Sequence, residues 1–247
     1  MDDSAPRRRP GSRWVLVPIA LGVLGLLAAL LQARSAGPDR AEQARAVPAP
    51  AVDAVVAPAR PGGTETAVFA GGCFWGVQGV YQHVKGVTQA VSGYAGGDAQ
   101  SARYELVGTG VTGHAEAVEI TYDPAQISYG QLLRIFFAVV HDPTQVDAQG
   151  PDRGPQYRSA IFPRSPDQQR VAEAYIGQLD RDRTFVGKIA TRLETGEFFP
   201  AEAYHQDYLK DNPAQPYIVA YDLPKLEDLK QVFPDLYREQ PALVNAG

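Results

Sequence analysis

Cys73 is the only cysteine in the chain, and it follows two glycines and precedes the aromatic residues Phe74 and Trp75. The segment Cys73–Tyr81 predicts a helix that opens on the cysteine, so the sulfur would lie in the first turn. Unpaired amides and the positive end of the helix dipole stabilise a thiolate there. A lone cysteine is more often a small buried apolar residue, but here the glycines let the backbone wrap closely around an approaching molecule. We therefore predict a nucleophilic sulfur, with Phe74 and Trp75 lining an apolar pocket.

A candidate proton donor, Glu116, lies in the segment His114–Tyr122, whose apolar and polar residues alternate as in a strand. In such a strand the carboxyl shares a face with Val118, Ile120 and Tyr122. Burial on an apolar face removes water from a carboxyl and raises its pKa. A carboxyl that stays protonated near neutral pH can act as a general acid. The alternative is a carboxylate near the surface at the end of the strand.

Short blocks surround these two residues in a fixed order. Over about residues 66–209 the chain resembles the A-type peptide methionine sulfoxide reductases, through Gly71–Gly76 (GGCFWG), Gly93–Gly97 (GYAGG), Tyr104-Glu105, Gly108–Glu116 (GTGVTGHAE), His141–Thr144 (HDPT), Asp152–Ser159 (DRGPQYRS) and Ala203–Leu209 (AYHQDYL). The resemblance implies an enzyme that repairs oxidised proteins, a peptide-methionine (S)-S-oxide reductase. Its substrate would be the S-epimer of methionine sulfoxide, in proteins and as the free amino acid.

The resemblance assigns the chemistry to the same two residues. Sulfoxide reduction needs a soft nucleophile at sulfur and a proton at oxygen, because the oxygen leaves poorly until it is protonated. Cys73 would attack, and Glu116 would be the acid.

The resemblance also implies how the substrate is held. Tyr104 and Tyr157 match two tyrosines that hydrogen-bond the sulfoxide oxygen, as in an oxyanion hole. Asp152 matches an aspartate that orients these donors. His205 and Tyr208 match members of a polar network beside the site.

No metal ion or cofactor is expected. A single cysteine excludes a multi-cysteine metal site, and the four histidines of the chain are scattered. His114 and His141 are expected to be structural. The two aromatic residues beside the cysteine would seat the terminal methyl group of the substrate.

Recycling departs from the pattern of many relatives, which use extra C-terminal cysteines. This chain has none, so a sulfenic acid formed on Cys73 would be resolved by an external thiol such as thioredoxin or a glutathione system. Pro151 and Pro155 also differ, because relatives commonly have a polar residue and a threonine at these positions. That loop therefore lacks one amide and one hydroxyl.

Strands and helices are interleaved without the regular rhythm of a parallel sheet. We expect strands at residues 65–70, 86–94, 114–122, 157–162 and 188–193, and helices at 73–81, 129–140, 166–179 and 201–209. Ser128 and Ser165 are predicted N-caps. The expected fold is α+β, a two-layer sandwich in which helices pack on a ferredoxin-like mixed sheet.

The two ends of the chain differ in charge. Residues 1–63 carry 8 basic and 5 acidic residues, whereas residues 64–247 carry 15 and 23. The acidic excess argues against nucleic-acid binding. Arginines in Arg7–Arg13 precede the uncharged run Trp14–Leu31, whose 18 residues reach the lower limit for a membrane span. We favour an uncleaved signal anchor at residues 1–32, with a cleaved signal peptide as the alternative because Ala33–Ala36 suits signal peptidase.

Residues 33–63 hold five prolines and many alanines, which is typical of a semi-stiff linker. The catalytic domain would then be residues 64–247, outside the cytoplasm by the positive-inside rule. We expect a periplasmic or otherwise extracytoplasmic, membrane-anchored monomer. Its partners would be oxidised proteins or peptides and a thioredoxin-like reductant.

Two other function classes use the same features. A Cys–His hydrolase exported to the envelope would need a histidine that deprotonates Cys73. A non-catalytic module that binds oxidised methionine would not need both Cys73 and Glu116, so it ranks last.

Overall fold

The computed structural model describes Met1, residues 44–54 and residues 63–244. The expected anchor run Trp14–Leu31 and most of the expected linker lie outside these residues. Within the described part of the chain, no helix is both long and apolar enough to cross a membrane.

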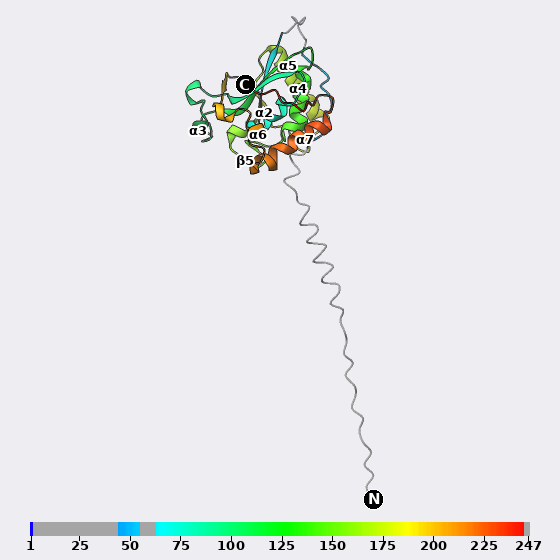
Figure 1. The fold of residues 1–247 in the computed structure, drawn as a ribbon. Coiled ribbons are helices and arrows are strands. Elements are labelled where there is room, and N and C mark those ends of the chain that lie inside the picture. Colours follow the sequence, from blue (N-terminus) through cyan, green and yellow to red (C-terminus); the bar gives the residue numbers. More distant parts are fainter. Residues whose placement is uncertain (2–43, 55–62, 245–247) are drawn as a thin grey trace. The chain divides into compact units, whose positions relative to one another are not determined.

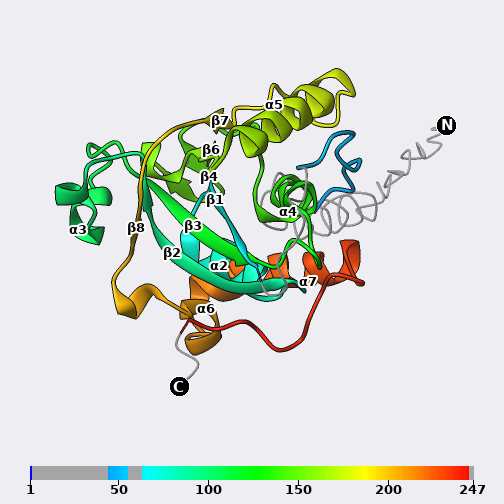
Figure 2. The ribbon, with the colours of Figure 1, turned by 90° about the horizontal axis from the view of Figure 1, so that it is seen from above.

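The centre of the fold is a six-stranded mixed sheet (Figures 1 and 2). Its strands, in spatial order, are β7 (Arg192–Leu193), β6 (Ser159–Ile161), β1 (Glu65–Gly71), β3 (Ala115–Tyr122), β2 (Val87–Ala95) and β8 (Phe198–Pro200). All neighbours run antiparallel except β6 and β7, which are parallel. A separate two-stranded ladder joins β4 (Ala148–Gln149) to β5 (Asp152–Arg153).

The topology confirms the predicted α+β class. Helix α2 (Phe74–Gln82) connects β1 to β2, and helix α4 (Tyr129–Ile135) lies between β3 and β6. The order β1-α2-β2-β3-α4-β6 is that of the ferredoxin-like fold. Both helices pack on the same face of the sheet, where they share one apolar core.

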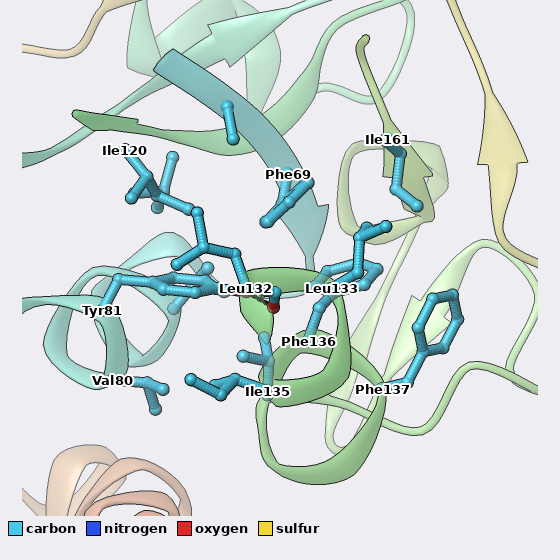
Figure 3. Packing of buried hydrophobic residues seen from close by; sticks show 14 of the residues in the cluster. Phe69, Val80, Tyr81, Ile120, Leu132, Leu133, Ile135, Phe136, Phe137 and Ile161 are labelled. Carbon is cyan, nitrogen blue, oxygen red and sulfur yellow. Dashed lines mark hydrogen bonds between the residues drawn. The ribbon is translucent and has the colours of Figure 1, made fainter. Parts of the chain in front are cut away.

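Large side chains from the sheet and from both helices meet in this core, and many of them are aromatic (Figure 3). The ring of Phe69 on β1 lies 5.8 Å from that of Tyr81 on α2 and 5.1 Å from that of Phe136. The hydroxyl of Tyr81 donates to the carbonyl of Leu132 at 3.0 Å, which satisfies its one polar group. The opposite face of the sheet is covered by smaller residues, chiefly alanines, with Phe162.

Ser128 begins α4 as a full capping box with Gln131, so the predicted N-cap is confirmed. The helix expected to reach residue 140 instead changes at Phe136 into a π-helical turn, Phe136–Val140. Ser165 likewise caps α5 (Pro166–Arg181).

Three other expected elements are shorter than predicted. The strand expected at 157–162 is only β6, preceded by a 3₁₀ turn at Pro155–Tyr157, because Pro155 begins that turn. The strand expected at 188–193 is only β7, and the helix expected at 201–209 is a 3₁₀ turn, Ala203–His205, followed by α6 (Tyr208–Asp211). Further short elements are a 3₁₀ turn at Ala99–Ser101 and α3 (Tyr104–Val107).

Residues 44–54, which fall in the expected linker, lie against the folded domain, and we call them the N-terminal strap. Val47 is 2% exposed and belongs to the main core. Its carbonyl accepts from Arg134 Nε at 3.0 Å, and the carbonyl of Pro48 accepts from the Tyr175 hydroxyl at 2.7 Å. Asp53 accepts from the amide of Gly130 at 2.7 Å. The strap therefore extends the compact part of the chain beyond the boundary expected at residue 64.

The C-terminal segment also covers α2. A π-helical turn, η6 (Ile218–Asp222), leads into helix α7 (Leu223–Val232), and both pack on α2. No motif in the sequence had indicated these elements.

Candidate active site

Cys73 is the N-cap of α2 and lies two residues after Gly71, the last residue of β1. The turn requires Gly72, whose φ is +92° and where a Cβ would come within 2.7 Å of the Gln149 side chain. The chain therefore turns sharply between strand and helix, and Cys73 as a residue is half-buried. The predicted position of the cysteine at the helix start is confirmed.

Glu116 lies behind the cysteine on β3, and it is 3% exposed. Its Oε2 accepts from the amide of Phe74, the first residue of α2, at 3.0 Å. Burial raises the pKa of Glu116 to about 8, although the hydrogen bond from Phe74 opposes the shift. The carboxyl is thus protonated at neutral pH, as the pattern of the strand predicted.

The thiol of Cys73 differs from the sequence-based expectation of a stabilised thiolate. Burial raises the pKa of this thiol well above its ordinary value of 9.0. At the high pH where the thiol would ionise, Glu116 is ionised too, and the charges of Glu116 and Asp222 raise the pKa further. The amide of Trp75 acts in the opposite direction but does not prevail. Desolvation and nearby carboxylates thus outweigh the helix terminus, and the substrate-free protein holds a neutral thiol.

Two phenols face this pair of groups. Burial raises the pKa values of Tyr104 and Tyr157, and Glu116 and Cys73, when ionised, raise them further. Both hydroxyls therefore keep their protons at pH 7 and can donate hydrogen bonds. The backbone amide of Tyr104 donates to Glu202 at 3.0 Å, which fixes the start of α3.

An aromatic group lines one side of the site. The ring of Trp75 stacks on that of Tyr208 with centroids 3.8 Å apart and planes 9° apart. Its Nε1 donates to Nδ1 of His205 at 3.2 Å, and the His205 ring lies 4.4 Å from that of Tyr104. Burial lowers the pKa of His205, so the imidazole is neutral and its Nδ1 can accept. The structure thus brings Trp75, His205 and Tyr208 together.

Phe74 is buried, whereas the neighbouring Trp75 is only partly buried. Phe74 is only 1% exposed, and its ring packs 5.8 Å from Tyr94 and 5.0 Å from His205. Trp75 keeps part of its surface open. Of the two aromatic residues, Trp75 is the one that an incoming side chain can touch.

Asp152 approaches the site from β5, and its charge acts on Cys73, Glu116 and Tyr157. Its Oδ2 accepts from the hydroxyl of Tyr217. Tyr217 was missed by the sequence interpretation, which found no element beyond residue 209. The signal available was an aromatic residue between proline and an apolar run (PYIV), which is weak by itself.

The histidines support no Cys–His pair. Among the described residues, the groups that shift the pKa of the Cys73 thiol are carboxyls and a backbone amide. His141 lies nearby, but its ring nitrogens contact the Phe136 carbonyl at 3.1 Å and the Ser159 hydroxyl at 2.7 Å, and burial lowers its pKa to about 3. His114 contacts backbone atoms of residues 97 and 98. The hydrolase alternative therefore lacks its general base.

A metal centre has no support within the part of the chain that the structure describes. Three or more histidine, cysteine, aspartate or glutamate side chains do not gather there in a manner that could hold an ion.

Comparisons with known proteins extend the likeness beyond the site. The family model described as "Peptide methionine sulfoxide reductase" matches residues 65–236. "Peptide methionine sulfoxide reductase MsrA 2" of Mesorhizobium japonicum is 61% identical over 183 residues, which cover 74% of this chain and 94% of that protein. A protein of the same name from Synechocystis is 50% identical over 197 residues, covering 79% and 92%.

Solved structures agree. Mxr1 from Saccharomyces cerevisiae in reduced form superimposes with a TM-score of 0.57 at 32% identity, covering 66% of this chain and 93% of that one. Methionine sulfoxide reductase A of Corynebacterium diphtheriae gives 0.53 at 35% identity, covering 71% and 90%. The region matched by the family model, residues 65–236, includes the C-terminal segment with η6 and α7. With its fold, its cysteine at the start of α2 and these relatives, the chain belongs to the A-type peptide methionine sulfoxide reductases, oxidoreductases that act on methionine sulfoxide in proteins.

Proposed function

We propose that the chain reduces the S-epimer of methionine sulfoxide through a sulfenic acid on Cys73. The observation that carries the proposal is the buried carboxyl of Glu116, with a pKa of about 8, beside the only cysteine. The site holds no disulfide partner and needs none for this first step. Both protein-bound and free methionine sulfoxide are proposed as substrates.

The first half of the reaction transfers an oxygen atom. Cys73 Sγ attacks the sulfoxide sulfur while Glu116 protonates the sulfoxide oxygen, and Tyr104 and Tyr157 hydrogen-bond that oxygen as its charge grows. The attack forms a bond between Sγ and the substrate sulfur, and the sulfur–oxygen bond of the substrate breaks. The oxygen then bonds to Sγ as the sulfur–sulfur bond breaks, which releases the thioether and leaves a sulfenic acid on Cys73. The substrate gains two electrons, the cysteine loses two, and the thiol proton replaces the one that Glu116 gave.

The second half restores the thiol. One external thiol attacks the sulfenic acid, which releases water and leaves a mixed disulfide on Cys73. A second external thiol then frees Cys73 and forms a disulfide between the two reductant sulfurs. The chain has one cysteine, so no intramolecular disulfide forms within it. A thioredoxin-like protein or a glutathione system would supply these thiols, and no cofactor takes part.

The test uses the full chain and both epimers of dabsyl-methionine sulfoxide without reductant. We expect one product per enzyme, from the S-epimer alone, and a protein mass increased by one oxygen on Cys73. Dimedone should trap this oxygen-bearing form, and an added thiol should reverse it. Cys73→Ser should give no product. Product from that variant, or product release with no change in mass, would contradict the proposal.

We further propose that the N-terminal residues 1–32 hold the enzyme at a membrane, with the catalytic domain outside the cytoplasm. The arginines before the uncharged run Trp14–Leu31 support this arrangement. Protease added to intact spheroplasts should degrade the domain, and the enzyme should sediment with membranes. Recovery in the protease-protected soluble fraction would contradict the arrangement.

A further inference from the structure

Two buried charges lie beside the Cys73 end of α2 and have no part in the proposed reaction. Asp222 ends the π-helical turn η6 and is 0% exposed, and Lys225 in the first turn of α7 is 4% exposed. Lys225 Nζ lies 3.7 Å from Asp222 Oδ1. Lysine and aspartate are almost never fully buried unless they are paired, and a buried ion pair is weak support for stability because removing both charges from water costs free energy.

The pair lies directly against the turn that carries the cysteine. At Gly76, three residues after Cys73, a Cβ would overlap the carboxylate of Asp222 and come within 3.4 Å of Lys225 Nζ. The absence of a side chain at residue 76 thus lets the ion pair pack against the first turn of α2.

The carboxylate of Asp222 acts on the groups of the site. Its charge raises the pKa of the Cys73 thiol and, to a smaller extent than burial, that of Glu116. The charge of Lys225 acts on His141, whose pKa it lowers in addition to the larger effect of burial. The ionisable groups that face the thiol are three carboxyls and three phenols, namely Glu116, Asp152, Asp222, Tyr104, Tyr157 and Tyr217.

We propose that Asp222, held in its ionised form by Lys225, is a positioning residue that keeps Cys73 as a neutral thiol while no substrate is bound. The carboxylate of Asp222 supplies a negative charge near the sulfur, and Gly76 allows it to pack against the first turn of α2. The role is independent of the acid, because Glu116 approaches the sulfur from β3 and Asp222 approaches it from η6.

A neutral resting thiol discriminates against peroxides. With hydrogen peroxide the thiolate is the attacking form: its sulfur takes one oxygen, the O–O bond breaks, and Cys73 becomes a sulfenic acid with release of hydroxide, which takes a proton from the solvent. A second peroxide would carry it on to the irreversible sulfinic acid. An enzyme that works where methionine is oxidised meets the same peroxides, so a low thiolate fraction preserves its only cysteine.

Alkylation of the full chain by iodoacetamide across pH tests this inference, since the rate follows the thiolate of Cys73. Asp222→Asn removes the carboxylate and leaves the ammonium. We expect the alkylation midpoint to fall by about one pH unit, which means about tenfold faster alkylation and peroxide oxidation at neutral pH. The double variant Asp222→Asn/Lys225→Met removes both charges, and its midpoint should lie between those of Asp222→Asn and the unmodified chain.

Lys230→Met is the matched control. Lys230 on the same helix also lies 3.7 Å from a carboxylate, that of Glu239, but both side chains are exposed. The alkylation midpoint of the Lys230→Met variant should equal that of the unmodified chain. Midpoints unchanged or higher in the folded Asp222 variants would overturn the inference, and the double variant decides alone if Asp222→Asn does not fold. The inference rests on the proposed role of Cys73 as the reacting sulfur, but alkylation needs no sulfoxide, so its outcome is separate from failure of the proposed function.

Discussion

Replacing Glu116 by glutamine removes the proposed acid while keeping the size of the side chain and an oxygen that can accept from the Phe74 amide. With a pKa of about 8, roughly nine-tenths of the molecules hold this proton at pH 7. At the ordinary value of 4.5 only about 0.3% would hold it, so burial enriches the acid form about 300-fold. We expect Glu116→Gln to slow single-turnover reduction at pH 7 by about 10²–10⁴, the usual contribution of a general acid.

The same substitution should change stability in a direction set by the pKa. Between pH 4.5 and about 8 the folded state holds a proton that the unfolded state has released. The free energy of unfolding of the unmodified protein therefore falls as pH rises through this range and levels off above it. The loss is a few kcal/mol, since each pH unit corresponds to about 1.4 kcal/mol. Glu116→Gln should unfold at a higher temperature than the unmodified chain at pH 8.5, with a smaller difference at pH 5.

Rapid-quench measurements with the S-epimer from pH 5.5 to 9.5, together with thermal unfolding, check both effects. The unmodified enzyme should lose activity above pH 8, and the variant should lack this decline. Glu119→Gln, on the same strand but the opposite face, is the control. A variant with the normal rate at pH 7 and the normal decline above pH 8 would refute Glu116 as the acid and move that role to a phenol such as Tyr104.

Three further predictions follow from the contacts of the site and the strap. Trp75→Ala should lower kcat/KM for sulfoxide by about 10–200-fold, because an apolar pocket contributes about 1–3 kcal/mol. The rate at which peroxide oxidises Cys73 should change far less, and equal losses in both rates would show that the ring controls the reactivity of the sulfur instead of binding the substrate. Tyr217→Phe removes the hydroxyl that donates to Asp152, and should lower kcat/KM by about tenfold, as for a hydrogen bond to a charged group; an unchanged value would exclude a role for it. Val47→Asp should destabilise the domain by at least about 1.5–3 kcal/mol, the burial of one such side chain, as measured by urea unfolding, whereas Val52→Asp, 37% exposed on the same strap, should have little effect.

The local sequence pattern was sufficient to predict the positions of Cys73 and Glu116. Two glycines before the cysteine predicted the turn into α2, and the alternation of β3 placed Glu116 on the buried face. Both signals are physical requirements of the backbone, so a single sequence displays them. The raised pKa of Cys73 is different, because it comes from burial and from the charges of Glu116 and Asp222. Asp222 lies 149 residues further along the chain, on the turn η6 that packs against α2.

The C-terminal elements show why the remainder could not be predicted. Helix α7 is short, has proline in its first turn and places charged Lys225 inside, so its sequence lacks the usual amphipathic stripe. The expected helix through Val140 failed for a related reason. An apolar run without polar positions carries no period, and tertiary packing changed its last five residues into a π-helical turn.

The N-terminal strap also determines how the domain would respond to mechanical load. Its hydrogen bonds reach α4, α5 and α7, through Gly130, Tyr175 and Asp228 among others. Strand β1, by contrast, lies inside the sheet and begins at Glu65, so a pull delivered there would peel the sheet from its centre. A force applied to the chain ahead of Ala44 meets the strap first, where its bonds to the different helices would break one after another. The contacts of the strap would therefore have to break before a pull from its N-terminal side loaded β1, the strand that leads to Cys73.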